Sequence, residues 1–325
     1  MDPKDREAFA KKMEKFIEEH ARAHANGVCG FKKEFALKNR LGASGKHGEV
    51  YAGPEVPAHT GPAFAIKIMP IKTKNINELK HYQVFNKLVT EGRNPHFPLV
   101  YHEDECSTAC PFKTKRYKGE ACLLLMKEYA DGDLRSWLES NLGELDAAPF
   151  LSMWAQVGLM GFGLARAGVV HNDLHWGNLL YNSVPAVTGK YMYYRVGRKR
   201  VYVKLTGQHW TVWDFGLSIN AVPPLETSVF IDMYRLSAMS TWIQEHYMKG
   251  ELAASLPPNL SYLCERIHAF TRTPRSGVTF LTFLRFLETE FAAIDPSVLL
   301  IDPSNDLIPA PSTIINPRKP YKITG

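Results

Sequence analysis

The sequence has no run of 18 or more consecutive apolar residues, the length that a membrane-spanning helix needs. The segment from Met1 to His24 is charged and has no apolar core of the kind found in signal peptides. Cysteine is scarce: five residues, an odd number, lie scattered from Cys29 to Cys264, which is typical of a reducing compartment. We therefore expect a soluble intracellular protein of the cytoplasm or nucleus, with free thiols and no membrane association.

A strong net charge is also missing. The 39 Lys and Arg residues exceed the 33 Asp and Glu residues by six in a chain of 325 residues, so the net charge of +6 does not by itself indicate nucleic-acid binding. No internal repeat is present. The hydrophobic content of 45% is normal for a packed globular core of one large or two medium domains.

The two ends of the chain have distinct patterns. Residues 1–30 are expected to form an N-terminal helical extension, because apolar residues from Phe9 to Ile17 recur at helical spacing, and the helix should continue to about Ala25. Residues 301–325 are rich in proline, which removes backbone donors and blocks helix formation. We expect them to form an extended tail.

Between these ends the pattern changes once. Residues 31–130 have short β-branched and apolar runs, with expected strands at 49–51, 64–68 and 123–126 and one expected helix at 76–89. Residues 131–300 are mainly helical by period, over 134–168 and 232–291, with short strands at 169–170 and 212–213. The predicted fold class is therefore α+β, with a small β-rich lobe followed by a larger, mainly helical lobe.

A glycine-rich string at residues 41–51 leads into an expected strand. Glycine lets backbone N–H groups approach phosphate oxygens that a side chain would hold away. Counted back from Val50, the pattern G-x-G-x-x-G-x-V fits Gly45 and Gly48 but has alanine at the first glycine, with Gly42 one position early. The string predicts either a phosphate-binding loop or an ordinary glycine-rich hairpin turn.

The next expected strand carries a lysine that is a candidate phosphate ligand. Ala65 and Lys67 lie in an apolar run, and the amine of Lys67 can reach the α- and β-phosphates, although a lysine ending an edge strand is usually just solvated. Such a lysine needs an acidic partner on a neighbouring helix. Glu78 begins the expected helix, whereas Glu91, the substitute, falls past its end.

Residues 127–134 connect a buried-looking strand to a helix. A connector at this place would offer the backbone groups of Glu128 and Tyr129 to adenine. The carboxylate of Asp131 or Asp133 would bind the ribose. The alternative is a plain strand-to-helix loop.

The string from His171 to Asn178 is the most informative. It contains Asp173 and, five residues later, Asn178, which is the spacing of the catalytic loop H-R-D-x-x-x-x-N. A carboxylate must orient the attacking hydroxyl and accept its proton, while an amide oxygen binds the metal on the ATP phosphates. Downstream, Asp214 in Asp-Phe-Gly ends an apolar strand and supplies a second metal ligand. These motifs occur in the order that Mg²⁺-dependent phosphoryl transfer from ATP requires.

In this order the motifs resemble those of the protein-kinase superfamily, and the likeness extends from Leu41 to Leu236, where residues 232–236 resemble the helix that anchors the catalytic loop. The strings 173–178 and 94–101 are most similar to haspin-type kinases and to the serine/threonine kinases of large DNA viruses. The resemblance implies a bilobal kinase-like fold, ATP and Mg²⁺ as cofactors, and protein substrates. For a viral protein it also implies a location in the host cell or virion.

Three departures from the kinase pattern bear on function. Asn172 replaces the arginine that pairs with a phosphorylated activation loop in regulated kinases. Asp232 follows Asp214 by only 18 positions, and no A-P-E string is present beyond a remnant at 224–226. Both changes predict activity without activation-loop phosphorylation. His175 stands where most serine/threonine kinases have lysine, and the resemblance assigns it to the catalytic group.

Three functions therefore stay open. The first is a serine/threonine protein kinase. The second is a small-molecule phosphotransferase, because aminoglycoside and choline kinases share the histidine at position 175. The third is an ATP-binding pseudokinase scaffold, which the presence of all five chemical positions disfavours.

Residues 182–212 form an insert between the two metal-binding motifs. The segment up to position 213 contains six Lys or Arg residues and no Asp or Glu. Apolar and basic residues alternate over 200–205, which predicts a hairpin that turns near Gly197 with one apolar and one basic face. The hairpin at 190–204 is either a solvated structural ribbon or a docking surface for acidic protein substrates, with nucleic acid less favoured.

One spacing suggests a metal. His102, Cys106 and Cys110 are separated by three residues each. Zinc sites usually present a fourth ligand and more closely spaced cysteines, so the sequence does not favour a zinc site at these three residues.

Overall fold

The computed structural model describes residues 3–25, 28–32, 35–45, 48–56, 63–114, 118–141, 145–239, 241, 243, 258–272 and 278–323. The chain divides into two compact units. The smaller unit comprises Lys4–Lys87 and Pro98–Tyr129, and the larger unit comprises Met1–Pro3, Leu88–Phe97 and Ala130–Gly325. Helices and antiparallel sheets both occur, so the fold class is mixed α+β, as the sequence predicts.

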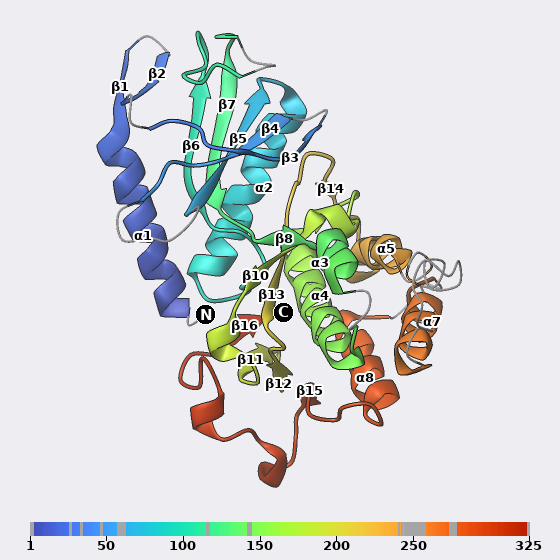
Figure 1. The fold of residues 1–325 in the computed structure, drawn as a ribbon. Helices are drawn as coiled ribbons and strands as arrows, with labels where there is room; N and C mark the ends of the chain where they lie inside the picture. The colour runs from blue at the N-terminus through green and yellow to red at the C-terminus, as the bar shows by residue number, and fades with distance from the viewer. Residues whose placement is uncertain are drawn as a thin grey trace. The chain divides into compact units, whose positions relative to one another are not determined.

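The smaller unit is built on a five-stranded antiparallel sheet in the order β3-β4-β5-β7-β6 (Figure 1). The strands are β3 (Arg40–Gly45), β4 (Gly48–Ala52), β5 (Phe64–Pro70), β6 (Val100–Cys106) and β7 (Cys122–Glu128). β5 and β7 are buried along almost their whole length, which explains their continuous apolar sequences. Helix α2 (Thr73–Thr90) buries Tyr82 and Phe85. The predicted strands and helix are confirmed.

The N-terminal helix is shorter than predicted. Helix α1 (Pro3–His20) buries Met13 and Ile17 as expected, but it ends five residues before Ala25. The next residues form β1 (Ala21–Ala25), which pairs with β2 (Val28–Phe31). The carbonyl of His20 accepts the N–H of Lys32 at 2.9 Å, so pairing with a following segment replaces the next helical hydrogen bonds.

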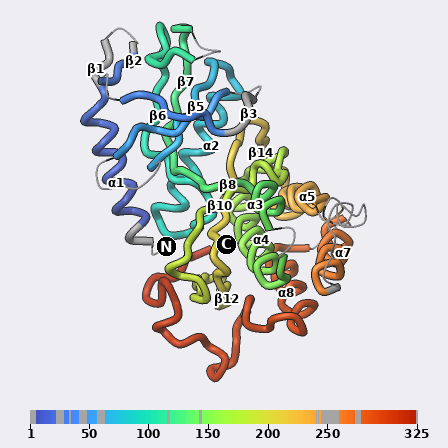
Figure 2. The backbone as a smooth tube through the Cα atoms, in the orientation of Figure 1, coloured from blue at the N-terminus to red at the C-terminus, as the bar shows by residue number. Residues whose placement is uncertain are grey.

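Helix α4 (Ala147–Ala167) is the central helix of the larger unit (Figure 2). Among the described residues, it packs against α5 (Leu225–Ser237), α7 (Pro258–Arg272) and α8 (Phe280–Phe291). A Cβ atom at Gly161 would lie 2.1 Å from the Phe280 ring, so glycine allows α8 to pack closely. Among the described residues, α4 is the one helix long and apolar enough to cross a membrane. Its apolar window is 89% buried inside the structure, as in a core helix.

Short strands of the larger unit position its polar loops. Helix α3 (Leu134–Asn141) follows β8 (Gly132–Asp133), which belongs to a sheet in the order β13-β10-β8. β10 (Leu179–Ser183) and β13 (Gln208–Val212) pair antiparallel, and so do β9 (Val169–Val170) and β14 (Ile219–Asn220). The strand predicted at 212–213 ends at Val212.

The predicted hairpin is present and turns at Gly197, which has a φ of 58°. β11 (Tyr191–Val196) and β12 (Lys199–Lys204) form its arms. The alternation of faces is less simple than predicted, because Tyr202 on the expected basic face is only 4% exposed and stacks on Tyr193, with ring centroids 4.8 Å apart.

The C-terminal segment is not an extended tail. β15 (Leu299–Ile301) pairs with β12, and β16 (Tyr321–Ile323) pairs in parallel with β11, giving the order β15-β12-β11-β16 (Figure 1). Between them lie two short 3-10 helices, at Asn305–Leu307 and Pro311–Thr313. Proline excludes a long α-helix here, but it fits the first turn of a 3-10 helix.

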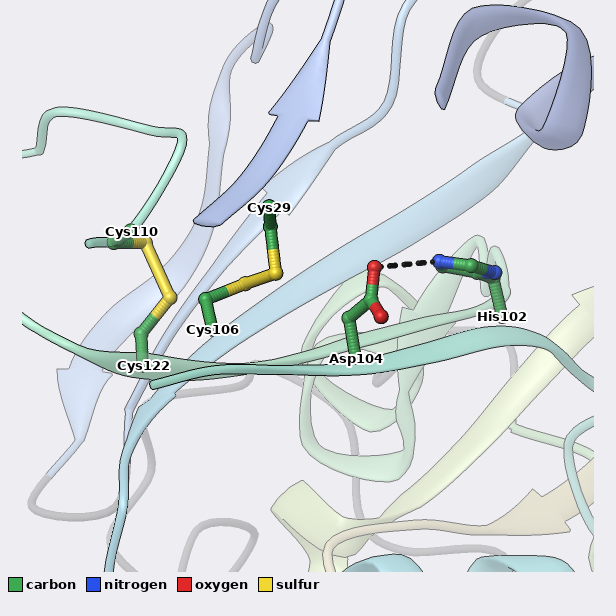
Figure 3. Close-up of a disulfide and its surroundings, with 6 residues drawn as sticks. All are labelled: Cys29, His102, Asp104, Cys106, Cys110 and Cys122. Atoms are coloured by element: carbon green, nitrogen blue, oxygen red, sulfur yellow. Dashed lines mark hydrogen bonds and ion pairs between the residues drawn. A yellow bond between two sulfur atoms is a disulfide. The ribbon is translucent and has the colours of Figure 1, made fainter. Parts of the chain in front are cut away.

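The expectation of free thiols is wrong for four of the five cysteines. Cys29 is bonded to Cys106 and Cys110 to Cys122, with Cα atoms 5.2 and 5.3 Å apart (Figure 3). Cys264 is free and buried. Their sequence separations of 77 and 12 leave no local pattern, so this pairing was not visible in the sequence.

The zinc set considered from the sequence is also not formed. Cys106 and Cys110 belong to different disulfides, and His102 instead lies 2.9 Å from the carboxylate of Asp104 (Figure 3). Within the part of the chain that the structure describes, no group of three or more His, Cys, Asp or Glu residues forms a metal site in this oxidised state.

Candidate active site

The smaller unit holds a buried ion pair between β5 and α2. Lys67 Nζ lies 2.6 Å from Glu78 Oε1, and the two side chains are 4% and 0% exposed. Glu91, the substitute partner, is exposed beyond the end of α2 and bonds to Arg93 at 2.9 Å. The pairing of Lys67 with Glu78 agrees with the sequence prediction. A buried pair of this kind keeps the amine charged and fixes its position.

The glycine-rich string forms the β3–β4 hairpin. Gly45 is opposite Gly48, and the register shifts between Leu41 and Gly45, so that Gly42 lies in the irregular part of the pairing. Gly48 has a φ of 156°, and a Cβ atom there would lie 2.5 Å from the carbonyl oxygen of Ile68. Gly48 is therefore required by sheet packing, whatever the loop binds. Two residues of the string, at positions 46–47, lie outside the described part of the chain.

Strand pairing places the other expected nucleotide-binding residues of the smaller unit. Val50 is opposite Lys67 across β4 and β5, and Ala65 lies between Ala52 and Lys127 in the sheet. Tyr129 is the last residue of this unit. Val50, Ala65 and Lys67 thus lie on three neighbouring positions of one sheet.

Glu128 has a structural role that the sequence did not indicate. Its carboxylate binds Arg6 of α1 through two hydrogen bonds, at 2.8 and 2.5 Å, and also accepts the N–H of Leu99 at 2.9 Å. Its own N–H donates to the carbonyl of Leu99 at 2.9 Å. Of the backbone groups expected to meet adenine, the Glu128 N–H is thus already used in the smaller unit.

A second buried lysine was missed. Lys127 is 3% exposed, and its Nζ donates to the Tyr82 hydroxyl at 2.7 Å and lies 4.7 Å from the centre of that ring. Sequence reasoning treated Lys127 only as the start of the connector. Its position directly after the continuous apolar run of β7 was the available signal that it is buried.

The expected ribose ligands cap local structure in the larger unit. Asp133 Oδ1 accepts the N–H of Ser136 at 2.7 Å and so begins α3. Asp131 Oδ2 accepts the N–H of Ser183 at 2.7 Å. Each carboxylate has further acceptor capacity, because one oxygen can accept more than one hydrogen bond.

The loop at 171–178 is held by hydrogen bonds to a residue of α5. Asp232 is buried, and its two carboxylate oxygens accept the N–H groups of His171 at 2.7 Å and Asn172 at 2.8 Å. Burial raises the pKa of Asp232 to about 6, against the opposing effect of these two N–H groups. The anchoring role expected for the helix at 232–236 is thus present as hydrogen bonds.

His171 links this loop to the Asp-Phe-Gly string. Its Nε2 donates to the Trp213 carbonyl at 2.8 Å, and its Nδ1 accepts the N–H of Asp173 at 3.3 Å. Burial lowers the pKa of His171 to about 4, so the ring is neutral with its proton on Nε2. Phe215 packs against His171, with ring centroids 5.1 Å apart.

Asp173 and Asn178 are brought together by the loop itself. Asn178 Nδ2 donates to the Asp173 carbonyl at 3.0 Å. This hydrogen bond fixes the orientation of the Asn178 amide and leaves its oxygen as a candidate metal ligand. His175 Nδ1 accepts the N–H of Gly177 at 3.0 Å, and its Nε2 lies 3.9 Å from Asp173 Oδ2. The side chains of His175 and Asp173 are 51% and 43% exposed to solvent.

Asp214 lies beside the same loop. The residue before it, Trp213, donates its N–H to the Asn178 carbonyl at 2.9 Å, so the backbone of one expected metal ligand is hydrogen-bonded to the residue that precedes the other. Asp214 has a φ of 63°, as does Asn172. Non-glycine residues in this left-handed region are uncommon and gather at functional sites.

The residue types here fit magnesium held mainly by phosphate. Mg²⁺ prefers hard oxygen ligands and typically takes one or two from the protein, with phosphates and water supplying the rest. Asn178 offers an amide oxygen and Asp214 a carboxylate. The donor set therefore fits a metal bound together with ATP.

An arginine was missed beside this loop. Arg235 on α5 donates to the side-chain oxygen of Asn172 at 2.9 Å and also to its carbonyl, while Asn172 Nδ2 donates to the Leu217 carbonyl at 3.1 Å. A guanidinium thus lies beside the position where kinases have arginine in the loop. The sequence placed Arg235 in the anchoring helix but did not indicate this contact.

A pocket of about 530 Å³ opens beside Asn172. Its walls come from β9, β14, α5 and the end of α7. Several apolar side chains on its rim are exposed to solvent, at 52%, 69% and 47% for Ile219, Val222 and Ile231. Large apolar side chains gathered at one exposed place are typical of a binding surface.

Three of the six basic residues of the hairpin are bound by residues between 297 and 303. Lys199 pairs with Asp302 at 2.6 Å, Lys204 bonds to Ser297 at 2.9 Å, and Arg200 donates to the Pro303 carbonyl at 3.2 Å. The others, Lys190, Arg195 and Arg198, are exposed and make no ion pair within the described part of the chain.

Comparison with known proteins gives no family assignment: no protein-family model matches the chain, and no curated protein matches it.

Proposed function

We propose that the protein is an ATP- and Mg²⁺-dependent serine/threonine protein kinase with a bilobal kinase-like fold. The observation that carries the proposal is the hydrogen-bonded frame of the larger unit, in which Asp232 holds the loop of Asp173 and Asn178, and Trp213 connects that loop to Asp214. The buried Lys67–Glu78 pair of the smaller unit supports it independently.

Each residue then has a definable task. Lys67 binds the α- and β-phosphates, with its charge maintained by Glu78. Asn178 and Asp214 would hold Mg²⁺, which would neutralise charge on the phosphates. Asp173 orients the substrate hydroxyl and accepts its proton. His175, whose Nε2 lies 3.9 Å from Asp173 Oδ2, would help to position that carboxylate.

Activity without activation-loop phosphorylation is part of the proposal. In regulated kinases the loop arginine is held by a phosphate group that is added later. Here Asn172 already bonds to Arg235 and to the Leu217 carbonyl, so the loop is held by contacts that need no modification.

A protein substrate is favoured by the apolar pocket next to Asn172. Its exposed rim beside the residue that precedes Asp173 fits an apolar side chain near the accepting hydroxyl of a peptide. The second candidate, a small-molecule phosphotransferase, is favoured by His175 and by the short stretch between Asp214 and Asp232.

The test compares the native chain with Asp173→Asn, using labelled ATP, a host-cell extract and a panel of antibiotics, amines and sugars. We expect phosphoserine and phosphothreonine on proteins from the native chain only. A control variant, Asp306→Asn, changes an exposed aspartate in a 3-10 helix and should retain full transfer. Label on a small molecule alone would select the second candidate.

Binding separates both enzymes from a pseudokinase scaffold. Mg-ATP should raise the melting temperature of the native chain and of Asp173→Asn, because Asp173 acts on the hydroxyl and not on the nucleotide. A chain that binds Mg-ATP but transfers no phosphate to either class of substrate would be a scaffold.

A further inference from the structure

The four disulfide-bonded cysteines form one cluster in the smaller unit (Figure 3). Cys106 ends β6, Cys122 begins β7, and the two are direct partners in the strand register. Such partners point to the same face of a sheet, with Cβ atoms about 4.5–5.5 Å apart. Each is bonded to one further cysteine, so all four sulfur atoms gather at one end of this strand pair.

The surroundings hold the four positions in place. Cys29, Cys106, Cys110 and Cys122 are 3%, 0%, 6% and 0% exposed. The N–H of Cys110 donates to the Glu120 carbonyl at 2.8 Å, which ties its loop to the start of β7.

Two aromatic residues are close in sequence to cysteines of the cluster. Phe31 and Phe112, each two residues after a cysteine, stack with ring centroids 5.5 Å apart. An apolar, buried and fixed set of sulfur atoms is suited to metal binding when it is reduced.

We propose that Cys29, Cys106, Cys110 and Cys122, when reduced, bind one zinc ion as a structural site. Four thiolates are a common ligand set for structural zinc, and Zn–S bonds of about 2.3 Å place neighbouring sulfur atoms roughly 3.8 Å apart. Cα separations of 5.2 and 5.3 Å within each pair accommodate this spacing by rotation of the cysteine side chains. Of the three residues that the sequence suggested, Cys106 and Cys110 belong to this set, and the fold adds Cys29 and Cys122.

His102 is not part of this site. It lies four positions before Cys106 on β6, but its ring bonds to Asp104 at 2.9 Å. The ligands are therefore the four cysteines and not the histidine set that the spacing suggested.

The oxidised and zinc-bound forms are related by a balanced reaction. Four molecules of a thiol such as glutathione reduce the two protein disulfides, giving four protein thiols and two molecules of glutathione disulfide. Binding of Zn²⁺ then releases four protons, because each sulfur coordinates as a thiolate. In both forms the same segments are cross-linked: β2 to the end of β6, and the loop at Cys110 to the start of β7.

The experiment measures metal in the full-length chain, purified without oxygen in the presence of a thiol reductant. Elemental analysis should give about one zinc per chain, and replacement by Co²⁺ should give the absorption bands of a tetrahedral thiolate complex. Cys29→Ser and Cys106→Ser should lose the metal. Cys264→Ser changes the free cysteine outside the cluster and should retain it.

A measurement on the native chain guards against variants that fail to fold. In the reduced protein, a zinc chelator should lower the melting temperature, and an organomercurial should release the zinc. In protein oxidised until both disulfides are formed, the chelator should have no effect. Reduced, folded native protein that holds no zinc and gives no cobalt thiolate bands would overturn the proposal, irrespective of phosphate transfer.

Discussion

The carboxylate of Asp232 accepts the backbone N–H of His171 at 2.7 Å, and both groups are buried. Burial shifts the pKa values of the Asp232 and His171 side chains in opposite directions. It raises the pKa of Asp232 from 3.8 to about 6 and lowers the pKa of His171 from 6.5 to about 4. The loop that carries Asp173 is thus attached to two titrating groups whose effects on stability oppose each other over the same pH range.

The first prediction concerns this balance. Asp232 favours the folded state most below pH 4, and its contribution is lost as the pH rises to about 6. His171 favours the folded state most above pH 6.5, and its contribution is lost as the pH falls to about 4. In Asp232→Asn only the second effect remains. The free energy of unfolding should then rise with pH between 4 and 6.5, with a slope of up to about 1.4 kcal/mol per pH unit.

Urea unfolding at pH 4.5, 5.5 and 6.5 measures this slope. Glu18→Gln, on the exposed surface of α1, is the matched control and should follow the native chain. Equal pH dependence in the native chain and in Asp232→Asn would contradict the opposed titrations.

The second prediction concerns the buried pair of the smaller unit. Lys67→Met leaves Glu78 buried without its cation, so the free energy of unfolding should fall by about 3–5 kcal/mol. The double variant Lys67→Met, Glu78→Leu removes both charges and should recover most of the loss. Denaturant unfolding of the two variants and of Glu78→Leu completes the cycle. Neither the single nor the double variant should transfer phosphate, because the amine is absent from both.

Local patterns were sufficient to predict much of the fold. β5 and β7 are continuous apolar runs and α2 has apolar residues at helical spacing, so their positions are encoded within short windows. The partner of Lys67 was also predictable, because Glu78 is only 11 positions away and lies in the first half of the next helix.

The contacts that escaped prediction join distant positions. Arg235 and Asn172 are 63 positions apart, and Asn316 binds the backbone of Tyr193 across 123 positions. The end of α1 depends on pairing between β1 and β2, which overrides helical spacing. Such residues become neighbours only when the whole chain has folded, so their contacts leave no periodic signal in a single sequence.

The third prediction concerns Arg235 as a positioning residue. Arg235→Ala removes the contacts to Asn172, so Asp173 should lose its orientation and kcat should fall by about tenfold to a hundredfold, while the KM for ATP stays unchanged. Arg235→Lys should restore activity only in part, because an ammonium lacks the planar fork of guanidinium. Arg266→Ala breaks an exposed ion pair on α7 and serves as the control. A KM effect with unchanged kcat would contradict the positioning role.

The fourth prediction concerns the pocket beside Asn172. Val222→Asp and Ile231→Asp place a charge on an exposed apolar rim, where an apolar side chain of a peptide would be desolvated. The KM for a protein substrate should rise about tenfold or more, since loss of one buried apolar group costs about 1–3 kcal/mol. The KM for ATP and the melting temperature should not change. Leu307→Asp alters an equally exposed apolar residue away from the pocket and should leave all three quantities unchanged. If the pocket variants phosphorylate protein with unaltered KM, the substrate does not use this surface.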